Sequence, residues 1–159
     1  MPGYGTDLGL AEYADARGLT VPSGNVTAAR VRGSDYIDGM YGDRFPGVPA
    51  AGFAQERAWP RVGAADSYGG LIAADVIPER VVWASYEAAL YEMANPAGLA
   101  PVVTPGQLVI REKVGPLEVE YADAAATTGV VGSVPVLASV EGLLRPLLQP
   151  AYGPAVLVV

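Results

Sequence analysis

Residues 78–96 read PERVVWASYEAALYEMANP, and this stretch decides the fold class. Its apolar side chains recur at steps of four, three and four: Val82, Tyr86, Ala89 and Met93. That spacing is typical of one face of an amphipathic α-helix. Pro78 suits the first turn of a helix, and Asn95-Pro96 suits its end. The stretch therefore predicts a helix over 78–94 that buries its apolar face.

A second helix is predicted upstream, over 26–42. Its small and apolar residues are spaced by three and four: Val26, Ala29, Gly33, Ile37 and Met40. The polar residues fall mostly on the other side: Arg30, Ser34, Asp35 and Asp38. Gly33 and Gly39 each weaken an isolated helix by up to about 1 kcal/mol relative to alanine. A glycine also lets a neighbouring helix approach closely, so we expect packing at this face.

A shorter helix is predicted over 7–17. Thr6 is a suitable N-cap, and Asp7 lies near the positive end of the helix dipole. Its apolar residues are Leu8, Leu10, Tyr13 and Ala14. Gly18 is a suitable stop.

Residues 45–71 show neither helical nor strand periodicity, and they are rich in Gly and Pro. They predict a long ordered loop, which we call the arm. Pro60 disfavours the helical conformation at Trp59, so this residue is expected to be extended. Two interpretations of Trp59 stay open: a buried indole that anchors the arm, or a contact with a neighbouring subunit.

A β-hairpin is predicted at about 107–122. The runs 108–114 and 117–121 are rich in β-forming residues and flank Gly115-Pro116. Leu117, Val119 and Tyr121 share one face of the second strand, while the two glutamates between them share the other. Because an isolated hairpin is marginally stable in water, it should pack on the helices or on another chain.

The C-terminal part is predicted to contain one more helix and a tail. Residues 123–132 resemble a linker, and Pro135 is placed to open a helix that Pro146 kinks or ends. No charged side chain follows Arg145. The apolar, β-prone end of the chain would promote aggregation if it were left free.

The predicted fold is mainly α: a small bundle of about four helices with a β-hairpin, a long arm and an extended C-terminal tail. The chain has 159 residues, which suits one domain. We assign residues 1–150 to this domain and residues 151–159 to an extended docking tail. Hydrophobic types make up 51% of the chain, but Gly (20) and Pro (14) interrupt it often.

Composition restricts the chemistry. The chain has no His and no Cys, which excludes imidazole or thiolate catalysis, thiolate metal sites and disulfides. The carboxylate pairs Asp35/Asp38 and Glu118/Glu120 could bind Mg²⁺ or act as acid and base, but a solvated helix or strand face is the favoured interpretation. We predict no catalytic residue, no metal site and no cofactor, and a protein that is not an enzyme.

The charge restricts the partners. The formal net charge is −7, and no run of Lys or Arg occurs. Tight binding to a phosphate backbone needs several neutralising cations, so it is disfavoured. No apolar run approaches the roughly 18 to 20 residues that span a bilayer, and the N-terminus lacks the features of a signal peptide. We expect a protein made in the cytoplasm, with no membrane partner.

Several short motifs occur in order along the chain: Tyr36-Ile37-Asp38 with Tyr41-Gly42, residues 55–61 (QERAWPR), Ile77-Pro78, and residues 111–121 (REKVGPLEVEY). In this order, from about residue 4 to 148, the chain resembles the head-to-tail adaptor, or connector, proteins of tailed phages. It is also similar to a phage family labelled DnaT-like single-stranded-DNA-binding protein.

The resemblance implies a structural protein of the virion neck, assembled as a dodecameric ring that joins the portal to the next neck or tail protein. Double-stranded DNA would pass through the lumen without tight binding. The C-terminal segment would dock on the portal through Tyr152, Val156, Leu157, Val158 and Val159. Candidate contacts with subunits or neck proteins are Arg57, Trp59 and Arg61 in the arm and Arg111, Lys113, Leu117, Val119 and Tyr121 in the hairpin.

Two other functions stay open. The chain could bind single-stranded DNA by stacking bases on Tyr and Trp, with arginines such as Arg57 and Arg61 nearby. A metal enzyme that uses carboxylates is the third hypothesis.

Overall fold

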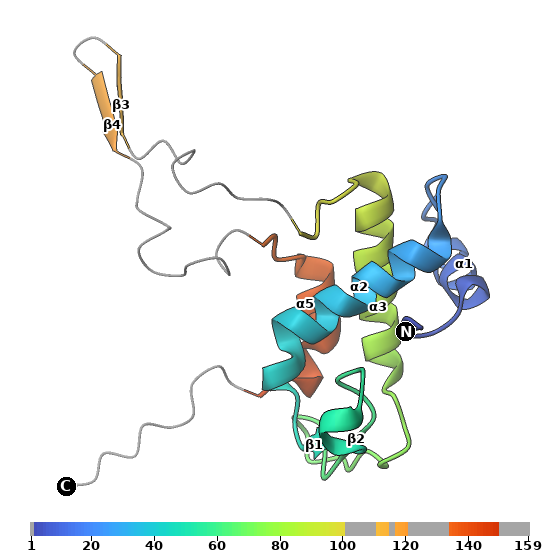
Figure 1. The fold of residues 1–159 in the computed structure, drawn as a ribbon. Helices are drawn as coiled ribbons and strands as arrows, with labels where there is room; N and C mark the ends of the chain where they lie inside the picture. Colours follow the sequence, from blue (N-terminus) through green and yellow to red (C-terminus); the bar gives the residue numbers. More distant parts are fainter. Residues whose placement is uncertain (1, 101–110, 115–116, 121–133, 150–159) are drawn as a thin grey trace, which may run out of the picture.

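The computed structural model describes residues 2–100, 111–114, 117–120 and 134–149. These residues form four α-helices: α1 (Asp7–Asp15), α2 (Val26–Tyr41), α3 (Glu79–Ala94) and α5 (Ala138–Leu144) (Figure 1). An antiparallel hairpin joins β3 (Arg111–Val114) to β4 (Leu117–Glu120), with Arg111 opposite Glu120. The predicted mainly α fold with a β-hairpin is confirmed.

Helices α2 and α3 cross at Gly33 (Figure 1). A Cβ atom at this position would lie 2.5 Å from the Ser85 carbonyl oxygen and 2.8 Å from the Ala89 nitrogen. No side chain fits in that space, so the predicted packing role of Gly33 is confirmed. Gly39 differs, because a Cβ atom there would meet nothing within 4 Å.

Local capping explains where the first two helices begin. The Thr6 hydroxyl accepts a hydrogen bond from the Gly9 N–H at 2.9 Å, and the Asn25 side chain accepts one from Ala28 at 2.9 Å. These bonds satisfy amide groups that have no partner within the helix. The bounds of α1 and α2 thus agree with the predicted 7–17 and 26–42 to within two residues.

The buried faces differ from the prediction on α2 and α1. Arg30 and Ser34 are buried, although they were placed on the polar side of α2. The N-terminal segment covers them: Ser34 accepts the Tyr4 N–H at 2.8 Å, and Arg30 donates to the carbonyls of Tyr4 and Gly5 at 3.0 and 2.8 Å. Conversely, Leu8 on α1 is exposed rather than packed. Periodicity cannot reveal such polar contacts between segments.

Helix α3 packs against both α2 and α5, so it is buried on more than one side. The main hydrophobic core lies between these three helices and the arm, and includes Ile37, Trp59, Val81, Val140 and Leu144. A second cluster joins α1 to the same two long helices through Leu10, Tyr13, Ala29, Tyr86 and Ala89.

The last helix begins later than predicted. It starts at Ala138 rather than near Pro135, because the preceding residues are extended and bound to α2. The Tyr36 hydroxyl donates to the Pro135 carbonyl at 2.6 Å and accepts from the Leu137 N–H at 3.4 Å. At its other end, α5 gives way to a 3₁₀ turn, η4 (Arg145–Leu147), which contains Pro146. The predicted effect of this proline is confirmed.

Four buried tyrosines predict cooperative alkaline unfolding. Burial raises the pKa of the Tyr4, Tyr13, Tyr36 and Tyr41 phenols above their usual value of about 10. The folded state then holds protons that the unfolded state releases, so stability is present below pH ~10 and is lost above it. We expect tyrosinate absorbance from these residues to rise together with loss of helical circular dichroism. Ionisation of all nine tyrosines of the chain at unchanged helical signal would contradict this.

Candidate assembly surface on the arm

The arm, residues 45–71, contains short regular elements that the sequence did not predict. Strands β1 (Val48–Pro49) and β2 (Arg61–Val62) pair antiparallel, with Val48 opposite Val62. Two 3₁₀ turns accompany them, η1 (Gly42–Arg44) and η2 (Gly52–Ala54). Strands of two residues leave too short an alternation to detect by periodicity.

A buried guanidinium holds the arm together from inside. The Arg61 side chain donates to four backbone carbonyls, of Phe45 at 3.3 Å, Pro46 at 2.8 Å, Gly47 at 2.8 Å and Ala58 at 3.1 Å. Burial lowers the pKa of Arg61, but an arginine stays charged at any ordinary pH. The guanidinium therefore supplies the hydrogen-bond donors that these four carbonyls would otherwise take from a strand or from water.

The Gln55 side chain closes the turn between β1 and β2. Its amide nitrogen donates to the carbonyls of Arg57 and Pro60 at 2.7 and 2.9 Å, and its amide oxygen accepts from the Ala51 N–H at 2.9 Å. Gln55, the first residue of the motif over 55–61, thus bonds within the arm.

Trp59 anchors the arm in the core. Its indole is buried and packs edge-on against Phe45, with ring centroids 5.5 Å apart. Its backbone N–H donates to the Tyr4 hydroxyl at 3.2 Å. The structure thus places Trp59 as the first of the two interpretations predicted, a buried anchor.

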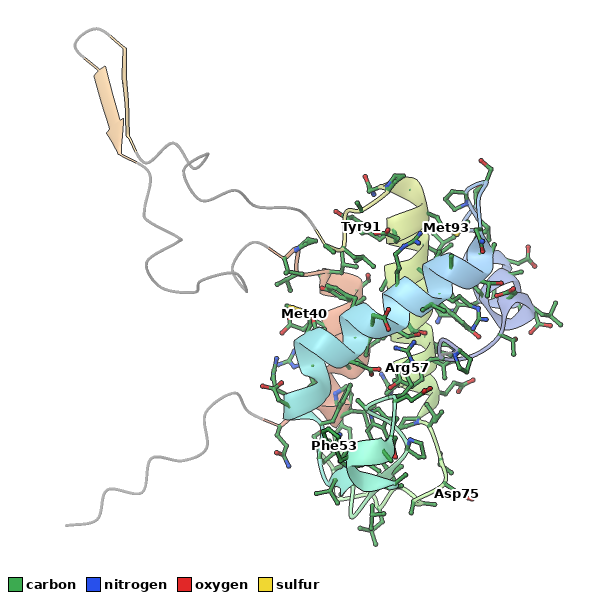
Figure 2. All side chains as sticks on the ribbon, viewed as in Figure 1. Met40, Phe53, Arg57, Asp75, Tyr91 and Met93 are labelled. Atoms are coloured by element: carbon green, nitrogen blue, oxygen red, sulfur yellow. The ribbon has the colours of Figure 1, made fainter. Side chains whose placement is uncertain are left out.

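Arg57 ties the arm to α2 and the N-terminal segment (Figure 2). Its guanidinium donates to Asp35 at 2.7 Å and to Asp38 at 3.2 Å, and also to the Pro2 carbonyl at 3.2 Å. Asp38 accepts a further bond from the Tyr4 hydroxyl at 2.6 Å. Burial raises the pKa of Asp38, while the bonds from Tyr4 and Arg57 oppose that rise.

This geometry leaves the carboxylates of Asp35 and Asp38 engaged with a cation of the chain itself. Among the described residues, no three acidic side chains gather as a metal site would require. Asp35 and Asp38 therefore form ion pairs that hold the arm against α2.

Several large hydrophobic side chains of the arm are exposed to solvent. The large hydrophobic side chains exposed there are Val48, Phe53, Val62, Tyr68 and Leu71. Phe53 is fully exposed on η2 (Figure 2). Val48 and Val62 lie opposite each other in the β1–β2 pair, and exposed apolar side chains that lie together mark sites of contact with other molecules. We call these five residues the apolar face of the arm.

Hydrogen bonds also order the outermost loop of the arm. The Asp66 carboxylate accepts the N–H groups of Tyr68 and Gly70 at 2.9 and 2.8 Å. The Ser67 N–H donates to the Pro146 carbonyl at 2.7 Å, which fixes the loop to η4. Tyr68 and Leu71 are therefore presented to solvent by a defined backbone.

The predicted contact residues are thus distributed over different parts of the chain. Arg57, Trp59 and Arg61 point inward and hold the arm, and Phe53, which the sequence did not single out, lies on its surface. Arg111 and Lys113 lie on β3, and Leu117 and Val119 on β4. Tyr121 and the docking residues Tyr152 and Val156–Val159 lie outside the described residues. The roles of all these residues as intermolecular contacts stay predictions.

A protein-family model matches nearly the whole sequence. The family described as "Putative DnaT-like ssDNA binding protein" matches residues 4–159. The chain belongs to this family. No match was found among curated proteins or among solved structures. Membership in the DnaT-like family confirms the second resemblance found in the sequence.

The DnaT-like family is described as binding single-stranded DNA, and such binding depends on cationic side chains such as arginine. Four of the described arginines are engaged with acidic side chains or carbonyls of the chain: Arg30 with Asp7, Arg32 with Glu92, Arg57 with two aspartates, and Arg61 with carbonyls. Single-stranded DNA is held by open cationic grooves with exposed aromatic side chains. Here Trp59 and five tyrosines are buried (Tyr4, Tyr13, Tyr36, Tyr41 and Tyr86).

Arg17 of this DnaT-like chain stacks on aromatic side chains of α1 and α3. The Arg17 guanidinium lies 3.6 Å from the centroid of the Tyr13 ring and 5.2 Å from that of Trp83. Trp83 is half-buried on α3.

No helix in the described ranges has both the length and the apolar character needed to cross a bilayer.

Proposed function

We propose that the chain is a structural subunit that forms a ring and joins a phage portal to the next neck or tail protein. The observation that carries this proposal is the apolar face of the arm, five large side chains held outward by an ordered backbone. When such a patch meets a different surface of the next copy, the contact is heterologous and can close into a ring.

The rigidity of the arm supports this role. Arg61 and Gln55 fix its interior, and Arg57 fixes it to α2. A preformed surface loses little conformational entropy when it binds, which favours assembly.

The electrostatics support passage of DNA without retention. The net charge is −7, and the arginines of the arm are engaged with carboxylates and carbonyls of the chain. A neck ring through which DNA slides must avoid neutralising many phosphates at once. The resemblance to head-to-tail adaptors is consistent with both features.

A second candidate function, binding of single-stranded DNA, is favoured by the description of the family. The stack of Arg17 on Tyr13 beside Trp83 is the described feature that fits it best. A base could stack on the half-buried indole while the guanidinium faces a phosphate.

One comparison separates the two functions. The full chain is mixed with portal particles of the same phage and imaged by electron microscopy, and it is titrated separately against a labelled oligonucleotide at low and moderate salt. We expect added density on the portal and no salt-dependent rise in anisotropy. Unaltered portals at saturating concentration would contradict the ring proposal. Salt-dependent DNA binding that is lost in Trp83→Ala would favour the second function.

A further inference from the structure

A groove runs along one side of α2. Its cavity volume is about 930 Å³. One wall follows a stripe from Arg32 on α2 to Asp43 on η1 that includes Tyr36 and Met40, and the opposite wall includes Leu99. The lining is mostly apolar, and its charged residues are Arg32, Asp35 and Asp43 in the stripe and Glu92 on α3.

The opposite wall is held in place by a buried carboxylate. Glu92 on α3 accepts the N–H groups of Ala97 and Leu99 at 3.1 and 3.2 Å. The Arg32 guanidinium approaches the same carboxylate at 2.8 Å across the groove. Both walls are therefore tied to one another, and the groove is a fixed feature of the bundle.

The chain leaves the described part at Gln149 beside one end of this groove, and Ala100 and Val134, which flank residues 101–133, also line it. The Gln149 N–H donates to the Arg44 carbonyl at 2.8 Å, and Arg44 follows Asp43, the last residue of the stripe. At about 1.5 Å per residue, the stripe from Arg32 to Asp43 is roughly 16 Å long. An extended segment of about five residues covers that length.

The segment that follows has a suitable length and chemistry. Residues 150–159 read PAYGPAVLVV and carry no charged side chain. They are about twice as long as the stripe, which leaves residues for the reversal of direction. Asp35, Asp43 and Glu92 outnumber Arg32 around the groove, so an acidic partner such as another surface of this chain is disfavoured. An apolar segment without charged side chains meets less of this repulsion.

We propose that residues 150–159 fold back and occupy the groove along α2 of their own chain. Burial there would shelter the apolar side chains Val156–Val159 in the free subunit. Occupation within one chain requires neither a ring nor a portal, so it can hold or fail independently of the proposed function.

Disulfide trapping tests this directly, because the chain has no cysteine of its own. Gly39→Cys places a thiol in open space on the groove wall, and it is combined with Val156→Cys or with Val158→Cys in the full chain. In a glutathione buffer we expect a disulfide within one chain, seen as a monomer in a non-reducing gel. At least one of the pairs should form about tenfold faster than the control pair Leu8→Cys with Val158→Cys, because proximity raises the effective concentration.

Three results would overturn the proposal. The Gly39 pairs could form no faster than the control pair, or they could form mainly between two chains and give dimers. Alternatively, Gly39→Cys could react with Val119→Cys in the hairpin in preference to the C-terminal segment, which would show that the insertion fills the groove instead.

Discussion

Replacing Gly33 with alanine is expected to lower the free energy of unfolding by about 3 kcal/mol. The new methyl group would lie 2.5 Å from the Ser85 carbonyl oxygen and 2.8 Å from the Ala89 nitrogen. Both atoms belong to the backbone of α3, so no side-chain rotation can relieve the clash. The two helices must move apart, and the core between them loses contacts. Urea denaturation followed by circular dichroism measures the change.

Gly39→Ala is the matched control on the same helix. Its methyl group meets no atom within 4 Å, so only the backbone effect remains. Alanine lowers the conformational freedom of the unfolded chain, and the variant should be more stable by up to about 1 kcal/mol. The two substitutions thus have opposite signs. If both stabilise the protein, the close crossing of α2 and α3 at Gly33 is incorrect.

Arg61→Ala is expected to cost about 3 kcal/mol, because it leaves buried carbonyls of the arm without a donor. The guanidinium satisfies four of them, and two of these bonds measure 2.8 Å. Arg61→Lys keeps the charge but not the planar fork, so it should lose a large part of the same stability. Denaturation measured by tryptophan fluorescence is suitable, since Trp59 is buried in the arm.

Arg80→Ala provides the comparison for Arg61. Arg80 is exposed on α3, and its removal should change stability by less than about 0.5 kcal/mol. Equal effects of the two substitutions would show that Arg61 does not organise the arm.

The helical part of the fold could be predicted because its signals are local. The spacing of Val82, Tyr86 and Ala89 and the caps at Thr6 and Asn25 depend only on neighbouring residues. The same holds for the end of α5 near Pro146. Such signals place an element on the chain, but they do not say what each polar side chain contacts.

The remainder depends on contacts between distant segments. Arg30 is buried because residues 4 and 5 cross it, and Glu92 is buried because the chain turns back over α3 at Leu99. In the same way, α5 starts late because Tyr36 binds the residues before it. None of these partners lies within one helical turn in the sequence, so periodicity alone does not reveal these contacts.

On the arm, too, the sequence identifies some residues, while the role of others depends on contacts between distant segments. The motif over 55–61 predicts intermolecular contacts, but in the fold Arg61 and Trp59 hold the arm from inside and Arg57 bonds it to α2. Phe53 carries no motif, and only the fold reveals that it is fully exposed. An isolated aromatic residue in a loop gives no sequence signal of exposure.

The central claim is that the apolar face of the arm drives assembly, and the most direct measurement compares two charge substitutions. Phe53→Asp alters this face, while Leu8→Asp alters an exposed apolar residue on α1. Both variants should keep the fold, as circular dichroism can verify. Formation of rings on portal particles, and the affinity with which they form, are then measured by sedimentation and electron microscopy. We expect Leu8→Asp to form rings like the unaltered chain, and Phe53→Asp to lose at least about tenfold in affinity, or roughly 1.4 kcal/mol. Undiminished ring formation by a folded Phe53→Asp variant would contradict the account.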